Sequence, residues 1–368
     1  MDFKPADFYQ RQTTLPEIGT AGQERLSKAK ILVIGCGGLG SVAAVYLAGS
    51  GMGTLHLIDY DMVSVSNLHR QVFYKTTDIG QPKAQVLANH IKAINPFVNV
   101  SFSTEALSKT HIKTIFAAYD IVLDCTDSLP TKYLINDACV LTHKVLVYGS
   151  LYKFDGYVAT FNALDDQGNR TANLRDAFPE MPQKYVPNCA EAGTLNSIVG
   201  LIGLMQANEV LKLVTKTGKP LTNQLLIYNS LENSQFKMKL KVSSKSHSEW
   251  LLKIAAIFKT ETYTDLGCAL QDESLLINAK TLKTQLKNNK ENLYLISVIE
   301  NPNTPLPFEV DAKIPLSQFN PKALKIDTQK TYVMVCQRGI TSYTAVKELK
   351  KSYPKLKALS LKEGIENF

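Results

Sequence analysis

The stretch Ile31-Leu32-Val33-Ile34-Gly35-Cys36-Gly37-Gly38-Leu39-Gly40 decides the fold. Its apolar half predicts a buried strand, and its glycines have the G-x-G-x-x-G spacing of a tight turn from a strand into a helix. Such a turn brings backbone N–H groups close to phosphate at a helix N-terminus, where the helix dipole favours an anion. The motif alone leaves three interpretations open, namely a turn without ligand, a redox dinucleotide site and an ATP site.

Outward from this turn, the chain alternates apolar strands with amphipathic helices. Strands are expected near 31–35, 54–59, 98–103, 120–124 and 145–149, and a helix over 82–94. This alternation predicts an α/β fold with a Rossmann-like, doubly wound parallel sheet. Alternating strands follow at 157–161 and 225–228. Residues 195–214 predict a buried core helix and not a membrane span, because polar residues such as Gln206 and Glu209 interrupt them.

Two domains are expected. Residues 1–242 form the nucleotide-binding domain, and the polar run Ser243-Ser244-Lys245-Ser246-His247-Ser248 opens a linker over 243–270. Residues 271–368 form a smaller α/β domain, with helices at 280–288 and 340–351 and strands at 293–296 and 331–335.

Composition narrows the class of protein. The 368 residues include 45% apolar residues, which is enough for each domain to bury a core. No secretory signal is expected from the first residues. Six cysteines without a C-x-x-C pair argue against a disulfide framework and favour the cytoplasm. The net charge of +8 comes without a basic block, so neither nucleic acid nor a membrane is an expected partner.

Acidic and basic residues after the turn favour ATP over a redox cofactor. Asp59 follows the second strand at the distance expected of a ribose ligand. Arg70 and Lys83, with Arg11 as a third candidate, supply cations that hydride transfer does not need. Lys83 lies in the first turn of its helix, where the dipole disfavours a cation by ~0.3–1 kcal/mol. A buried anion nearby would reverse that effect, and a solvated lysine is the plain alternative.

Asp127 follows the strand that ends at Asp124, at the edge where open α/β sheets bind ligands. A carboxylate there suits Mg²⁺ held together with phosphate oxygens. The alternative is an N-cap for the helix that begins near Pro130. Both interpretations hold at once if Asp124 takes one of the two roles.

Taken in order, these motifs resemble the ubiquitin-activating enzyme superfamily, in its bacterial branch of molybdopterin-synthase and thiamine sulfur-carrier adenylyltransferases (the HesA/MoeB/ThiF type). The resemblance covers residues 8 to 242. It rests on Tyr9-Gln10-Arg11-Gln12, the glycine turn, Asp59-Tyr60-Asp61, Ser66-Asn67-Leu68-His69-Arg70-Gln71, Gly80-Gln81-Pro82-Lys83 and Asp124-Cys125-Thr126-Asp127.

The resemblance implies an enzyme that uses ATP and Mg²⁺ to adenylate the C-terminal glycine of a small ubiquitin-like sulfur carrier ending in Gly-Gly. In such a site Asp59 would hold the ribose, Asp127 would engage Mg²⁺, and Arg11 would reach into the neighbouring site of a homodimer. Asn67, Arg70 and Lys83 would neutralise phosphates. The remaining cofactor-binding candidates are Gly35, Gly37, Gly38, Gly40, Asp61 and Gln71.

Two cysteines are candidates for sulfur chemistry. Cys189 lies near the start of the core helix, where relatives of this type carry a cysteine that forms covalent intermediates; a small buried side chain is the alternative. Cys336 ends an apolar strand, and Cys336-Gln337-Arg338-Gly339-Ile340-Thr341-Ser342 resembles a rhodanese active-site loop. Its N–H groups, the helix dipole and Arg338 favour a thiolate. The resemblance implies a persulfide on Cys336, loaded by a donor such as a cysteine desulfurase. Ser297-Val298-Ile299-Glu300 departs from the rhodanese pattern, so a docking module is the alternative.

Relatives of this type often hold zinc with two C-x-x-C pairs. Here those positions fall on Asn173 and Asp176, and on about Ser246 and Glu249. Because a closed zinc site needs thiolate or imidazole donors, no zinc is expected.

Two other functions stay open from the sequence. One is a nicotinamide-dependent oxidoreductase that uses the glycine turn and Asp59. The other is a carrier-binding scaffold without turnover. The pathway served, whether molybdenum cofactor, thiamine, cysteine or tRNA thiolation, is open as well, and so is a dehydratase branch of the same superfamily.

Overall fold

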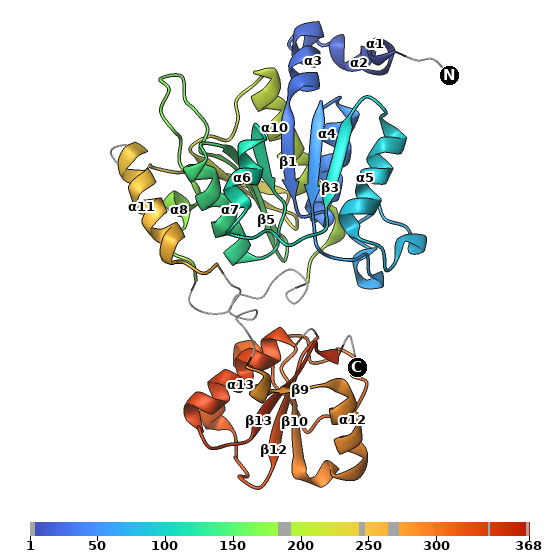
Figure 1. Ribbon diagram of the computed structural model, residues 1–368, viewed down its shortest axis with the longest axis vertical. Helices are drawn as coiled ribbons and strands as arrows, with labels where there is room; N and C mark the ends of the chain where they lie inside the picture. Colours follow the sequence, from blue (N-terminus) through green and yellow to red (C-terminus); the bar gives the residue numbers. More distant parts are fainter. Residues whose placement is uncertain (1–3, 183–192, 243–246, 264–271, 338, 366–367) are drawn as a thin grey trace. The chain divides into compact units, whose positions relative to one another are not determined.

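The computed structural model describes residues 4–182, 193–242, 247–263, 272–337, 339–365 and 368. The chain divides into two compact units, Met1–Tyr263 and Thr264–Phe368. Each unit has its own sheet, and each is described separately below (Figure 1).

Unit 1 is built on an eight-stranded sheet in the order β3-β2-β1-β4-β5-β6-β7-β8. The first five strands are parallel and the last three are antiparallel to their neighbours. This confirms the predicted Rossmann-like sheet. The strands are β1 (Lys30–Ile34), β2 (Thr54–Ile58), β3 (Asn99–Ser103), β4 (Ile121–Asp124), β5 (Val145–Tyr152), β6 (Asp155–Phe161), β7 (Gln224–Asn229) and β8 (Ser234–Lys239).

Helices cover both faces of this sheet. Alternate residues of β1 divide between two apolar cores: Ile31 and Val33 pack in one, and Leu32 and Ile34 in the other. A strand buried on both faces is what a parallel sheet requires, and it explains the unbroken apolar run. The described helices of unit 1 are α1 (Pro5–Phe8), α2 (Gln10–Thr13), α3 (Gly19–Lys28), α4 (Gly38–Gly49), α5 (Lys83–Ile94), α6 (Ile112–Ala117), α7 (Leu129–Leu141), α8 (Leu174–Ala177), α10 (Asn196–Thr215) and α11 (His247–Thr260).

Helix α10 is the predicted core helix. Among the described residues it is the helix long and apolar enough to cross a membrane, and half of its apolar window is buried inside the protein. Its polar residues have partners within unit 1. Gln206 Nε2 donates to Asp124 O over 2.8 Å, and Glu209 Oε2 accepts from Thr160 Oγ1 and from Leu221 N, each over 2.7 Å. These bonds explain how an apolar helix carries buried polar groups without a loss of stability.

Helix α11 lies inside the stretch expected as a linker. Trp250 and Ile254 pack onto Val140 of α7, and Lys109 Nζ donates to the carbonyls of Lys259 and Glu261 at the end of α11. The compact unit therefore continues to Tyr263, about twenty residues beyond the expected boundary at 242. Apolar residues at helical spacing, Trp250, Leu251, Ile254, Ile257 and Phe258, were the available signal.

Unit 2 has a five-stranded parallel sheet in the order β11-β10-β12-β13-β9. Its predicted helices and strands are confirmed within one or two residues. The elements are β9 (Leu276–Ile277), α12 (Ala279–Asn288), β10 (Leu293–Ser297), β11 (Ala312–Lys313), β12 (Thr331–Val335), α13 (Ile340–Ser352) and β13 (Ala358–Leu361).

Candidate functional site

The glycine turn joins β1 to α4 and fits only glycine at two of its positions. Gly35 has φ of +89°, and a Cβ there would lie 2.8 Å from Cys125 O. A Cβ on Gly40 would lie 1.8 Å from Gly35 O, so the first turn of α4 packs directly on the end of β1. The first N–H groups of α4 have no acceptor within the helix, as in any helix, and groups of this kind can bind an anion.

Asp59 follows β2 and accepts a hydrogen bond from the backbone of the glycine turn. Its Oδ2 accepts from Cys36 N over 2.6 Å, and its Oδ1 accepts from Asp61 N over 2.8 Å. Burial raises the pKa of Asp59, against the attraction of Lys83 and these two backbone bonds. The carboxylate thus stands at the mouth of the glycine turn, where the ribose ligand was predicted.

Lys83 is not a solvated lysine. It begins α5, is 4% exposed, and its Nζ lies 2.9 Å from Asp61 Oδ2. The side chain of Asp61 is 49% exposed, so the pair is closed on the lysine side and open on the carboxylate side. The anion that reverses the unfavourable dipole effect on Lys83 is therefore Asp61.

The loop 66–71 crosses beside the glycine turn. The carbonyl of Arg70 lies 3.2 Å from where a Cβ on Gly38 would be, and Gln71 Nε2 lies 3.5 Å from the same point on Gly37. Arg70 Nη1 donates to Ser66 O over 2.9 Å. Asn67 O accepts from the amides of Arg70 and Gln71 and so shapes the loop. Gln71 is buried, and its Oε1 has no hydrogen-bond partner among the described residues.

Asp124 and Asp127 have different environments. Asp124 is fully buried: its Oδ2 lies 3.2 Å from Lys132 Nζ, and its Oδ1 accepts from Thr126 N and Oγ1. Asp127 is exposed, and its side chain has no partner among the described residues. The proposed N-cap role of Asp127 is wrong, because helix α7 begins at Leu129 with Ser128 as its N-cap.

Three residues that the motif analysis missed hold the site together. Tyr74 OH donates to Cys36 O over 2.6 Å and so fixes the glycine turn. Lys132 Nζ bridges Asp124 and Gly149 O, and Gln206 holds Asp124 O from α10. The polar Gln206 within an apolar helix was a usable signal; Tyr74 and Lys132 had none.

Arg11 lies far from the glycine turn of its own chain. Beside it on α2, Gln12 Nε2 donates to Ser50 O over 3.0 Å, at the C-terminal end of α4. Figure 1 places α1 and α2 at the edge of the sheet where β1 begins, whereas the glycine turn follows the end of β1. The twelve residues of α4 separate the two places by roughly 18 Å.

The positions that align with the zinc ligands of relatives form other hydrogen bonds here. Asn173 caps α8 by accepting from Arg175 N over 2.9 Å, and Asp176 Oδ2 accepts from Asn173 N and Nδ2, each over 2.9 Å. Arg175 forms a two-pronged ion pair with buried Asp137, at 2.8 and 2.7 Å, and Tyr263 OH donates to the same carboxylate. Glu249 lies on α11, and Ser246 lies outside the described residues.

Of the two cysteines, Cys189 lies outside the described residues, and so does Arg338. Cys336 is 1% exposed and follows β12. Its Sγ accepts from Gly339 N over 3.1 Å and from Ser342 N over 3.3 Å, and Ser342 Oγ lies 3.1 Å away. The loop therefore directs N–H groups at the sulfur, as predicted.

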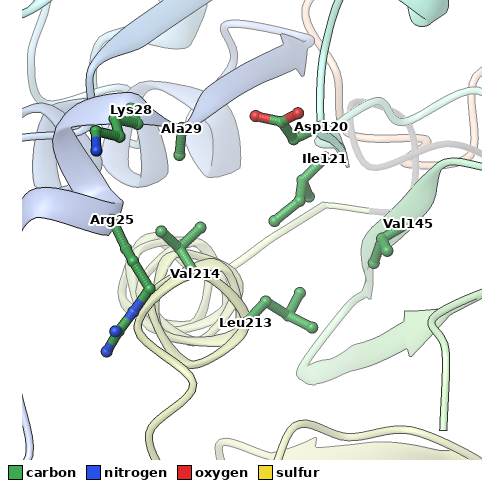
Figure 2. Close-up of a pocket in the computed structure, with 8 residues that line it drawn as sticks. All are labelled: Arg25, Lys28, Ala29, Asp120, Ile121, Val145, Leu213 and Val214. Carbon is green, nitrogen blue, oxygen red and sulfur yellow. The ribbon is translucent and has the colours of Figure 1, made fainter. Parts of the chain in front are cut away.

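A pocket of about 400 Å³ lies at the amino ends of the strands β1, β4 and β5 of unit 1, away from the glycine turn at their carboxyl ends (Figure 2). It is lined by Arg25, Lys28, Ala29, Asp120, Ile121, Val145, Leu213 and Val214. Because open α/β sheets bind ligands at the carboxyl ends of their strands, this pocket is separate from the nucleotide site.

Comparison with known proteins gives one family. Residues 9–251 match the model of the ThiF family. The chain is 43% identical over 233 residues to the sulfur carrier protein adenylyltransferase of Thermus thermophilus, covering 63% of this chain and 86% of that protein. It is 34% identical over 358 residues to the probable adenylyltransferase/sulfurtransferase MoeZ of Mycobacterium tuberculosis, covering 94% of this chain and 88% of that one.

Solved structures give the same fold at lower identity. Escherichia coli MccB in complex with MccA-N7isoASN has a TM-score of 0.58 at 20% identity, covering 67% of this chain and 74% of that one. MccB with ATP has a TM-score of 0.53 at 22% identity, covering 61% and 67%. These likenesses concern the fold alone, and they agree with the Rossmann-like sheet of unit 1.

Proposed function

The chain belongs to the ThiF family, and from that premise we propose that it is an ATP-dependent adenylyltransferase that acts on a sulfur-carrier protein and couples this activation to sulfur transfer. One observation carries the assignment to the site. A nearly buried lysine, Lys83, lies at the carboxyl edge of the sheet beside Asp59, and its ion-pair partner Asp61 is half-exposed. A phosphate that replaces or joins Asp61 meets a cation that is already desolvated and held in place.

The reaction follows from this arrangement. A carboxylate oxygen at the C-terminus of the carrier attacks the α-phosphorus of ATP, and the bond to the β-phosphate oxygen breaks. Pyrophosphate leaves and a mixed anhydride with AMP remains. The first turn of α4 would receive phosphate oxygens, and Asp59 would accept from ribose hydroxyls. Arg70 and Lys83 would offset negative charge, and the Asn67 amide would donate a hydrogen bond to a phosphate oxygen. No acid or base is needed, because positioning and charge neutralisation supply the rate enhancement.

At the carboxyl ends of the strands, Asp127 is suited to bind Mg²⁺. Asp127 offers an exposed carboxylate beyond β4, whereas Asp124 is fully engaged by Lys132 and Thr126. A hard oxygen ligand with room for phosphate oxygens and waters is what Mg²⁺ prefers. When bound, the ion would neutralise charge on the phosphates, and Asp127 would hold it.

Sulfur transfer is assigned to Cys336. A persulfide there would attack the acyl carbon of the adenylate through its outer sulfur and release AMP. A thiol would then break the S–S bond and release the carrier thiocarboxylate. A cysteine desulfurase is the proposed source of the persulfide sulfur, and a carrier ending in Gly-Gly is the proposed acceptor. Four free thiols in the described residues, Cys36, Cys125, Cys139 and Cys336, support a reducing, cytoplasmic location.

A homodimer is proposed from the position of Arg11. Its exposed side chain lies roughly one length of α4, about 18 Å, from the glycine turn of the same chain. A second copy related by two-fold symmetry brings Arg11 to the phosphate site of its neighbour, and the reverse.

A structure without zinc is proposed for the α7–α8 region. Where zinc ligands would stand, an amide and a carboxylate cap α8, and the Arg175–Asp137 ion pair ties α8 to α7. In the part of the chain that the structure describes, no three His, Cys, Asp or Glu side chains are grouped to hold a metal. These residues do not fit zinc.

The central test is exchange of labelled pyrophosphate into ATP, run with each small Gly-Gly-ending protein of the same genome. Lys83→Met is expected to lower exchange on the order of a hundredfold, as loss of a preorganised cation does. Lys92→Met is the matched control, because Lys92 lies on the same helix and is exposed. Full exchange by Lys83→Met, or NADH binding without ATP binding, would reject the assignment.

The dimer is tested by mixing two inactive variants, Arg11→Ala and Lys83→Met. In a mixed dimer the chain with intact Lys83 receives Arg11 from its partner, so one of the two sites is complete. A 1:1 mixture of exchanging subunits should recover about a quarter of the wild-type activity. Absence of recovery, with mixed dimers confirmed by native mass spectrometry, contradicts the role of Arg11.

A further inference from the structure

Cys336 is in contact with a chain of hydroxyl groups that extends beyond its own loop. Ser342 Oγ lies 3.1 Å from Cys336 Sγ and 2.8 Å from Ser360 Oγ. Ser360 Oγ in turn lies 3.4 Å from Gly339 O. Both serines are fully buried, so water does not compete for these bonds.

The parallel sheet of unit 2 brings these hydroxyl groups together. Cys336 follows β12, and Ser360 lies on the neighbouring parallel strand β13, where it is paired with Met334. Ser342 lies in the first turn of α13, within hydrogen-bond distance of the sulfur. Ser360 is 24 residues from Cys336 along the sequence, yet only the Ser342 hydroxyl separates it from the Cys336 sulfur.

The two hydroxyls have two possible hydrogen arrangements. When Cys336 is a thiol, its S–H donates to Ser342 Oγ, Ser342 donates to Ser360, and Ser360 donates to Gly339 O. When Cys336 is an anion, Ser342 donates to the sulfur, and Ser342 Oγ is free to accept from Ser360. Both hydroxyls only rotate about their Cβ–Oγ bonds, and the thiol proton leaves to solvent.

We propose that Ser360 is a positioning residue for Cys336, because it turns the Ser342 hydroxyl toward the sulfur whenever the sulfur is anionic. A serine that accepts one hydrogen bond donates a stronger one, so Ser360 strengthens the Ser342 bond to a thiolate or to a persulfide anion. The inference rests on the proposed function, in which Cys336 carries the transferred sulfur.

The test is the rate of Cys336 alkylation by iodoacetamide in the full chain, followed by peptide mass spectrometry from pH 6 to 10. Ser360→Ala is expected to move the pH profile toward alkaline pH and to lower the rate at pH 7 about threefold to tenfold, which is the effect of one buried hydrogen bond. The alkaline plateau reports access to Cys336, and it should not change. Ser360→Thr keeps a hydroxyl and should restore the profile.

A double variant tests whether Ser360 acts on Cys336 through Ser342 or independently of it. Ser342→Ala should shift the profile at least as far as Ser360→Ala. The Ser342→Ala/Ser360→Ala protein should match Ser342→Ala alone, because Ser360 acts only through Ser342. Ser297→Ala, at a buried serine of β10 with no bond to Cys336, is the control for a lost buried hydroxyl.

An unchanged profile in Ser360→Ala, or additive effects in the double variant, overturns the role of Ser360. A raised plateau without a shift in the profile also overturns it, since that result reports loosened packing. The proposed function has a separate readout. If Cys336→Ala still forms carrier thiocarboxylate, the sulfur-transfer assignment fails whatever the alkylation profiles show.

Discussion

Lys83 and Asp61 form an ion pair in which the two partners differ in exposure. The lysine Nζ lies 2.9 Å from Asp61 Oδ2, yet the lysine side chain is 6% exposed and the aspartate side chain 49%. The protein has therefore desolvated the cation during folding and left its counter-charge within reach of solvent. In the proposed function, a phosphate that approaches Lys83 would meet a cation that is already ordered and desolvated.

Asp61→Asn should destabilise the protein without ligand and make it more responsive to ATP. The variant removes the ion-pair partner of the buried Lys83 ammonium and leaves only the Asp59 carboxylate nearby, which should cost about 1–3 kcal/mol because the pair is half-open to solvent. ATP phosphates replace the lost charge, so an ATP analogue should raise the Tm of Asp61→Asn more than that of the wild type. Urea unfolding and thermal melting measure both effects.

The control is Glu24→Gln, which removes an exposed i,i+4 pair with Lys28 and should leave stability unchanged. An equal response to ATP in Asp61→Asn and the wild type would show that phosphate does not approach Lys83.

Gly40→Ala should abolish nucleotide binding and destabilise unit 1. Its Cβ would lie 1.8 Å from Gly35 O, so α4 must move away from the end of β1. Gly49→Ala on the same helix meets nothing within 4 Å and should stabilise by about 0.5–1 kcal/mol. Circular dichroism melts and ATP titration distinguish the two variants. Normal ATP binding by Gly40→Ala would contradict the close packing of the turn.

Arg175→Met should cost about 3–5 kcal/mol, because it leaves the fully buried Asp137 carboxylate without its cation. Arg175→Met combined with Asp137→Leu should recover much of that loss, since both charges are then gone. Added zinc should rescue neither protein, and EDTA should not change the Tm of the wild type. Stoichiometric zinc in the purified wild type, by metal analysis, would refute the assignment of this region.

Alkaline pH should weaken unit 1 through its buried tyrosines. Burial raises the pKa of Tyr133 to about 12, and it also raises that of Tyr263, which donates to Asp137. An unfolded tyrosine ionises near pH 10, so the stabilisation is complete below pH 10 and is lost as pH rises toward 12. Relative to Tyr133→Phe, the wild type should lose on the order of 1 kcal/mol over this range.

Urea unfolding at pH 8, 9, 10 and 11 measures that difference. Tyr46→Phe is the matched control, because Tyr46 is 53% exposed on α4. Parallel curves for the wild type and Tyr133→Phe across the whole range would contradict the link to burial.

Local patterns in the sequence predicted most of the secondary structure. The glycine turn, the strand β1 and the helix α5 depend on an unbroken apolar run, on a periodicity of 3.6 residues and on steric limits at glycine and proline, which act within a few residues. The boundary of unit 1 was placed too early. The polar run at 243–248 masked the helix α11, although its apolar residues have helical spacing. That this apolar face packs on α7, and so extends unit 1, is a tertiary contact that the spacing does not contain.

For the candidate site too, some features could be predicted from the sequence and others only from the structure. The order of motifs predicts Asp59, Lys83 and Asp127 as site residues, because each follows a strand or begins a helix at a known spacing. The role of Asp124 was open, and its pairing with Lys132 decided it. Tyr74 was missed as a support of the site, since nothing in its neighbouring residues marks a partner 38 residues away. Gln206 stood out as a polar residue in an apolar helix, but its partner Asp124, 82 residues away, is identified only by the tertiary structure.

The sequence by itself determined which groups are candidates for this chemistry: a glycine turn after a buried strand, a carboxylate after the next strand, cations further along the chain and a cysteine in a loop that opens a helix. Only the tertiary structure decided which of these groups are buried, which are paired and which lie far from the glycine turn. It buried Lys83 beside Asp61, placed Arg11 at the far end of α4, joined Asp137 to Arg175 and set Ser360 behind Ser342. The physical reason is that exposure and pairing depend on elements distant in sequence that pack together, whereas a motif records only the residues along one segment.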